Sequence, residues 1–154
     1  MLGSKSTYFF KSESDLQSCR IDMVAYLQIW KYSNEKIEVY LRAFDYFCNN
    51  PTHYDGETFV KDLYHIPELS ITAMLHDYHC IHYNTSANYY TKWYADWLYA
   101  KENERLGKAQ MSWLYFALLK IIGTIHLGIS IYKRGIITKK QKENILKDYN
   151  VLIK

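Results

Sequence analysis

Five side chains that could carry chemistry fall within seven residues near the middle of the chain: His76, Asp77, His79, Cys80 and His82. A further carboxylate, Asp96, follows twenty residues after His76. A histidine and an aspartate that face each other can share a charge-assisted hydrogen bond, and such a pair can act as a general base and its orienting group. His76 and Asp96 are therefore our candidate catalytic residues.

Two helices must position this pair. His76 follows the +4, +3 spacing of one helix face, together with Leu69, Ala73, Cys80 and Tyr83. Asp96 shares a second apolar face with Tyr89, Trp93 and Ala100. A short turn at residues 84–86 lets the two helices pack antiparallel and brings these faces together. A structural buried pair and a catalytic dyad both fit this pattern.

The three histidines also raise the question of zinc. Positions i, i+3 and i+6 point to different sides of a helix, and the sequence offers no obvious further ligand. We therefore expect no zinc site.

Aromatic residues are unusually frequent, with 16 Tyr, 4 Trp and 6 Phe. One small core cannot hide them all, and exposed Tyr and Trp are typical of protein interfaces. AT-rich codons offer a second explanation for the tyrosine count. The densest group lies on the second helix and is our candidate interface: Tyr89, Tyr90, Trp93, Tyr94, Trp97 and Tyr99.

Charge and cysteine content narrow the class of protein. The net charge of +3 is too small to require a nucleic-acid partner. The three widely spaced cysteines form no disulfide or zinc pattern, which favours a reducing compartment. The N-terminal residues lack the apolar run of a signal peptide.

We predict a single α+β domain over residues 1–154, with a β-rich part at 1–60 and a helical part at 61–154. Residues 23–32 and 37–46 are rich in β-branched and aromatic residues, and the second run alternates, so we expect a β-hairpin. A helix is the rival for the second run, because Leu41, Phe44 and Phe47 also form a helical stripe. Short strands are expected at residues 8–10 and 57–60.

Three to four helices are predicted in the C-terminal part. Pro67 opens the first helix, which runs to about residue 83. Thr85 or Ser86 caps the second, and Gly107 ends it. The apolar run at 112–132 is long enough for a bilayer, but Lys120 near its middle favours a core helix that ends near Gly123. A final amphipathic helix is expected at 138–150.

Around His76 the chain resembles a small family of unknown function from bacteriophages and prophages. The shared pieces are a segment with Phe59, Asp62, Ile66 and Pro67, the His76-Asp77-Tyr78 helix, the Ala95-Asp96 helix, and a helix with Tyr115 and Gly123. The resemblance covers about residues 57–123. It implies a phage-encoded protein, located in the virion or in the cytoplasm of the host bacterium.

That family is in turn similar to the His-Asp helix of parvovirus-type phospholipases. This similarity implies that His76 is the base, Asp77 a calcium ligand and Asp96 the orienting group. Those enzymes carry a Gly-rich calcium loop before the helix. Here residues 54–56, Tyr-Asp-Gly, offer a single glycine, and Cys80 replaces a tyrosine.

Because the segment at 54–56 matches the Gly-rich calcium loop poorly, we favour a structural protein over an enzyme. We expect a virion tail or connector component that acts through protein–protein contacts, without a cofactor. Its expected partners are other virion or assembly proteins or further copies of this chain, not a specific nucleic acid or a membrane. The alternative is a calcium-dependent, phospholipase-like hydrolase.

Overall fold

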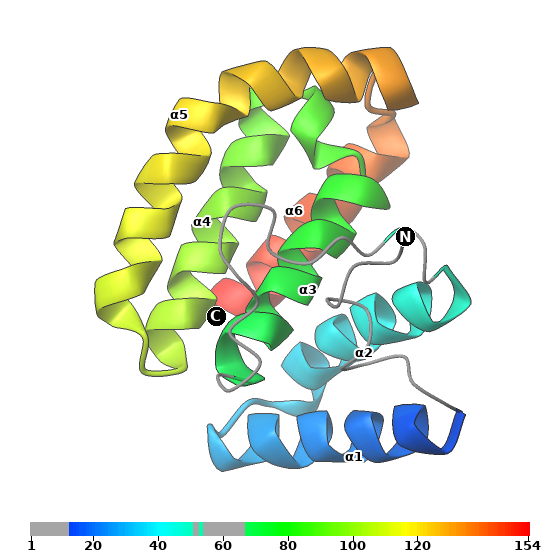
Figure 1. Cartoon of the computed structure of the whole chain (residues 1–154), viewed down its shortest axis with the longest axis vertical. Helices are drawn as coiled ribbons and strands as arrows, with labels where there is room; N and C mark the ends of the chain where they lie inside the picture. The colour runs from blue at the N-terminus through cyan, green and yellow to red at the C-terminus, as the bar shows by residue number, and fades with distance from the viewer. Residues whose placement is uncertain (1–12, 51–52, 54–66) are drawn as a thin grey trace. The chain divides into compact units, whose positions relative to one another are not determined.

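A computed structural model describes residues 13–50, 53 and 67–154 of the chain, and every regular element in these ranges is a helix (Figure 1). The fold is therefore all-α, and the expected α+β class is wrong. The elements, in chain order, are α1 (Glu13–Ile29), α2 (Asn34–Asn49), α3 (Pro67–Ile81), the 3-10 turn η3 (Thr85–Ala87), α4 (Tyr89–Arg105), α5 (Ala109–Arg134) and α6 (Lys139–Ile153).

The two predicted strands of the N-terminal hairpin are helices α1 and α2. Helix α2 buries a broad face, which includes the helical stripe Leu41, Phe44 and Phe47 and also the alternating residues Ile37 and Val39. A face this wide satisfies a period of two and a period of 3.6 at once. The alternation was therefore misleading, and the helical stripe was the better guide.

The chain divides into two compact units, Met1–Asp77 and Tyr78–Lys154, with the boundary inside α3. In the first unit, Lys31 at φ 59° ends the turn after α1. Ser33 then caps α2 by accepting a hydrogen bond from the Lys36 backbone N–H at 3.4 Å. Arg20 and Asp45 join the two helices through an exposed ion pair at 3.2 Å.

Several sequence expectations lie outside the described residues. They are the strands at 8–10 and 57–60, the glycine-containing loop at 54–56, and the matched residues Phe59, Asp62 and Ile66.

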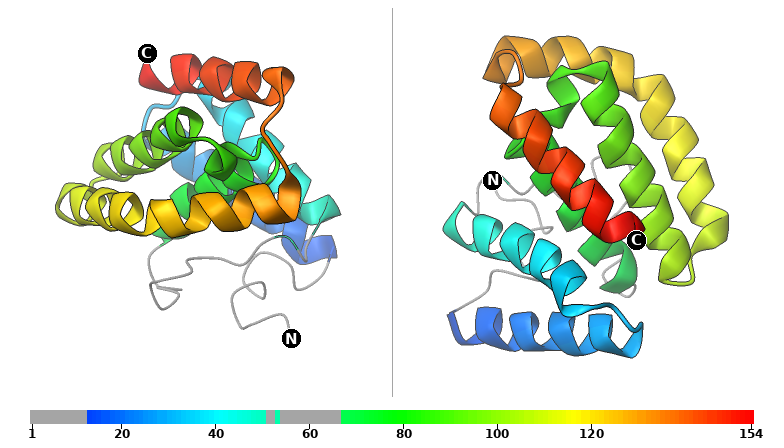
Figure 2. Two further views of the ribbon diagram at one scale, coloured as in Figure 1. Left: turned by 90° about the horizontal axis from the view of Figure 1, so that it is seen from above. Right: turned by 180° about the vertical axis from the view of Figure 1, so that it is seen from behind.

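In the second unit, α4 lies between α5 and α6 (Figure 2). The turn before α4 is formed by η3, and Asn84 precedes it in the left-handed conformation at φ 51°. Asn88 caps α4 by accepting from the backbone N–H groups of Tyr90 and Thr91. Thr85 and Ser86, the predicted caps, belong to η3 instead.

Helix α5 continues through Gly123 and Gly128 and ends at Gly135, whose φ is 74°. The helix therefore does not end near Gly123 as predicted, but it bends by 64° directly after this residue, between Ser112–Gly123 and Leu127–Arg134. Gly107, at φ 80°, follows α4 as predicted. Thr138 and Gln141 form a capping box at the start of α6, close to the predicted start.

Polar contacts tie the ends of these helices together. Asn84 donates its side-chain N–H to the Gly135 carbonyl at 2.9 Å, and Arg134 donates to the Asn84 side-chain oxygen at 3.2 Å. Arg105, near the end of α4, donates to the Leu152 carbonyl at 2.8 Å and to Glu102 at 2.7 Å. These bonds satisfy backbone carbonyls that a helix end leaves open.

Candidate functional site

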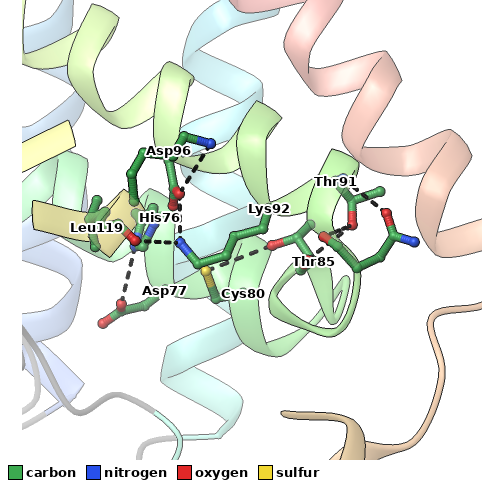
Figure 3. Close-up of polar contacts among 10 residues, drawn as sticks. His76, Asp77, Cys80, Thr85, Thr91, Lys92, Asp96 and Leu119 are labelled. Atoms are coloured by element: carbon green, nitrogen blue, oxygen red, sulfur yellow. Dashed lines mark hydrogen bonds and ion pairs between the residues drawn. The ribbon is translucent and has the colours of Figure 1, made fainter. Parts of the chain in front are cut away.

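Asp96 is buried between α4 and α5, in contact with Lys92 (Figure 3) and close to the half-buried Lys120. The Lys92 ammonium donates to Asp96 Oδ2 at 2.6 Å and to the Leu119 carbonyl at 3.3 Å. The Lys120 ammonium lies 4.0 Å from the same carboxylate oxygen. The Asp96 side chain is fully buried, so these cations compensate the cost of burying its charge.

Gly123 makes room for Lys92. A Cβ atom at this position would lie 2.8 Å from Lys92 Cε and 3.1 Å from its Nζ. Any side chain on Gly123 would therefore push the ammonium away from Asp96 and Leu119. The absence of a side chain on Gly123 therefore leaves room for Lys92 in its contact with Asp96.

Lys120 sits between the carboxylate and two aromatic rings. Its ammonium lies 5.8 Å from the centroid of the Trp93 ring and 5.2 Å from that of Phe116, within the range of cation–π contacts. Burial lowers the pKa of Lys120, while Asp96 raises it and Lys92 lowers it further. The Lys120 amine is thus easier to deprotonate than an ordinary lysine.

The cluster of Asp96 with its two lysines borders a small pocket that opens to solvent and has a cavity volume of only about 10 Å³. Its walls include Tyr89, Leu127 and the three charged residues described above. The volume is below the range usual for small-molecule sites, which begins at about 300 Å³. The arrangement is better suited to holding two helices together than to enclosing a substrate.

His76 and Asp77, the other predicted chemical residues, are half-buried neighbours on α3. Their side chains lie 3.8 Å apart, measured from His76 Nδ1 to Asp77 Oδ1. His76 belongs to the first compact unit and Asp96 to the second, so their pairing stays a prediction. Among the described residues, no group of three or more His, Cys, Asp or Glu side chains is placed to hold a metal ion. The role of Asp77 as a calcium ligand also stays a prediction.

A second buried histidine–aspartate pair was missed from the sequence. His79 Nε2 lies 3.2 Å from Asp148 Oδ2, and the two side chains are 0% and 2% exposed. The Tyr83 ring stacks on the His79 ring, with 5.7 Å between centroids. Asp148 lies 69 residues further along the chain, so no local spacing could have identified it.

Lys92 and Lys120 were missed as partners of Asp96. The spacing of Lys92 and Asp96, i and i+4 on one helix, was a usable signal. Lys120 was noticed only as the single charge in an apolar run.

The six predicted interface rings fall into three groups by exposure. Tyr89, Tyr90 and Trp93 are exposed, Tyr94 and Trp97 are half-buried, and Tyr99 is buried. Tyr94 packs edge-on against Tyr149 of α6, with 4.8 Å between centroids. The interface prediction therefore applies best to the rings at the start of α4.

Comparisons with protein-family models, with curated proteins and with solved structures found no match to this chain.

Proposed function

We propose that this chain is a bacteriophage-encoded structural protein, a tail or connector component of the virion that works through protein–protein contacts. The observation that carries the proposal is the exposed aromatic surface at the start of α4. Tyr89 is 58% exposed and Tyr90 is 81% exposed. The phage origin rests on the resemblance around His76.

Trp93, the third exposed ring at the start of α4, rests on a packed aromatic support. Trp93 stacks on Trp97 with an interplanar angle of 14° and 5.3 Å between centroids. Trp97 in turn packs edge-on against Trp113 and Phe116 of α5. Aromatic rings held in one geometry bury area in a partner at a low entropy cost, which is typical of interface hot spots.

The surroundings of Asp96 favour this proposal over the phospholipase-like hydrolase. In that enzyme Asp96 would orient His76, yet its Oδ2 already accepts a bond from Lys92 and lies near Lys120. The adjoining pocket is also small for a phospholipid headgroup. Both features fit a structural centre.

Mass spectrometry of purified particles, from a phage whose genome carries this gene, tests the proposal. We expect the chain to be present in a fixed number of copies per particle. Its absence from the particles would contradict the proposal. Calcium-dependent fatty-acid release from phospholipid vesicles that His76→Ala abolishes would replace the structural function with the hydrolase.

A further inference from the structure

Helix α5 carries its largest aliphatic side chains on the side that faces water. Seven large apolar residues are between 39% and 90% exposed and follow one another at spacings of three or four residues. We call them the outer face of α5: Leu114, Leu118, Ile121, Ile125, Ile129, Tyr132 and the following Ile136. Successive residues at this spacing lie on one side of a helix.

Apart from Tyr115, the buried residues of the same helix are small or polar. Ser112 and Ser130 are 0% and 2% exposed, and Gly123 is buried against Lys92. A surface helix in water normally has the opposite arrangement, with the aliphatic stripe inside. A contiguous apolar face of this length in contact with water marks an interaction site.

The charges along α5 and in the sequence directly before and after it have one sign. Between Leu106 and Lys142 the sequence contains no Asp or Glu and has seven basic residues: Lys108, Lys120, Lys133, Arg134, Lys139, Lys140 and Lys142. Lys108 precedes the apolar stripe, and the other basic residues except Lys120 lie near its end or beyond it. A partner that matches this face therefore has a surface that is both apolar and negatively charged.

The shape of α5 also restricts the partner. The helix bends by 64° between the stretches Ser112–Gly123 and Leu127–Arg134. Its concave side faces α4 and η3, so the outer face is convex (Figure 1). Ile121 and Ile125 lie close to the junction of the two stretches. A straight helix can follow only half of such a surface, whereas lipid adapts to it.

We propose that the outer face of α5 binds an anionic lipid membrane. Ile121 and Ile125 enter the boundary between headgroups and acyl chains, and the basic residues at both ends of α5 contact the negatively charged headgroups. Apolar insertion combined with basic flanks is the usual mode of interfacial helices. The residues of this surface are different from the exposed rings at the start of α4.

Lys120 does not oppose this placement. In the sequence it stands within the apolar run and argued against a membrane. In the structure its ammonium points toward Asp96, Trp93 and Phe116, which are not part of the outer face.

A second copy of the chain is a poorer occupant. Pairing two outer faces, parallel or antiparallel, brings basic ends together without an acidic residue from either α5. A third arrangement is one in which α5 spans the membrane. Among the described residues, no single helix has the length and hydropathy to cross a membrane, although the two bent stretches of α5 together pass this test.

The test is co-sedimentation of the whole chain with vesicles of phosphatidylcholine alone or with 30% phosphatidylglycerol (an experimental choice of about one anionic lipid in three). We expect binding to the anionic vesicles, at least about tenfold weaker binding to the neutral ones, and a decrease with added salt. Ile121→Asn with Ile125→Asn should abolish binding. Lys133→Gln with Lys140→Gln should weaken it, by about fivefold for each charge.

Ile29→Asn is the matched control, because Ile29 is 76% exposed but lies on α1. It should leave binding unchanged. Ile125→Glu is a second test that does not depend on the folding of the double variant, since it replaces one exposed residue and adds repulsion from anionic lipid.

Four results would overturn the proposal. The first is failure of the intact chain to bind anionic vesicles, and the second is an equal loss of binding in the Ile29 control, which has the same meaning. The third is a dimer, seen by light scattering, that the Ile121 and Ile125 substitutions dissociate, because this assigns the face to a second copy. The fourth is resistance to alkaline carbonate extraction, which assigns α5 to a span.

Discussion

His79 Nε2 and Asp148 Oδ2 lie 3.2 Å apart inside the second compact unit, although 69 residues separate them in the sequence. The pair joins the end of α3 to the middle of α6. Because both side chains are buried, removal of one partner leaves the other in an apolar environment without its bond.

We predict that Asp148→Ala lowers the free energy of unfolding by about 2–4 kcal/mol. Urea denaturation followed by circular dichroism measures this. Glu143→Ala is the control on the same helix, since this carboxylate is exposed and should change stability by less than about 0.5 kcal/mol. Equal effects of the two substitutions would show that the His79–Asp148 bond contributes nothing specific.

Replacing each of the two internal glycines of α5 by alanine should change the stability of the fold in opposite directions. Gly128→Ala meets no atom within 4 Å and should raise stability by about 0.5–1 kcal/mol, because alanine favours the helix. Gly123→Ala displaces the Lys92 ammonium from Asp96 and should lower stability by about 1 kcal/mol despite the same helical gain. Thermal unfolding of both variants measures the difference. A stabilised Gly123→Ala variant would contradict the close packing of Lys92.

Lys120 should react with amine-acylating reagents at a lower pH than an ordinary lysine. Burial lowers its pKa from 10.5, so a larger fraction is neutral, and therefore nucleophilic, at mildly alkaline pH. Peptide mass spectrometry after brief acylation over a pH series gives the rate profile, with exposed Lys147 as the reference. Asp96→Asn removes the influence that raises the Lys120 pKa, so the profile should move to still lower pH. A profile centred at 10.5 would contradict the prediction.

Substitutions of Tyr90 and Tyr99 should affect different properties, association with a partner in the first case and stability of the fold in the second. Tyr99 is 8% exposed, so Tyr99→Ala should lower stability by about 3–5 kcal/mol, as for a buried ring. Tyr90 is 81% exposed, so Tyr90→Ala should change stability by less than about 0.5 kcal/mol but reduce incorporation into phage particles. Quantitative mass spectrometry of the particles measures incorporation. Tyr132→Ala, on the outer face of α5, is the control that leaves the α4 rings intact.

Much of the helical part was determined by local signals in the sequence. Pro67 marked the start of α3, Gly107 followed the end of α4, and Thr138 marked the start of α6. These signals act through backbone groups within one turn of the residue concerned, so they need no tertiary structure. The six-ring segment of α4 was also recognisable, although its division into exposed and buried rings was not.

The strands predicted in the N-terminal part show where a local sequence pattern fails to predict the structure. Residues 37–46 alternate like a strand, but α2 buries a face wide enough to contain both periodicities. How wide a face is buried depends on the neighbouring elements, so only the folded chain decided between helix and strand.

The partners of the charged residues were decided by tertiary structure alone. Packing of α5 on α4 brings Lys120 to Asp96, and the fold of the second unit brings Asp148 to His79. The sequence contained the apolar residues of α5 but not the direction in which they point. That direction depends on which side of the helix α4 and η3 cover, because a helix of apolar residues has no inward side until another element packs against it.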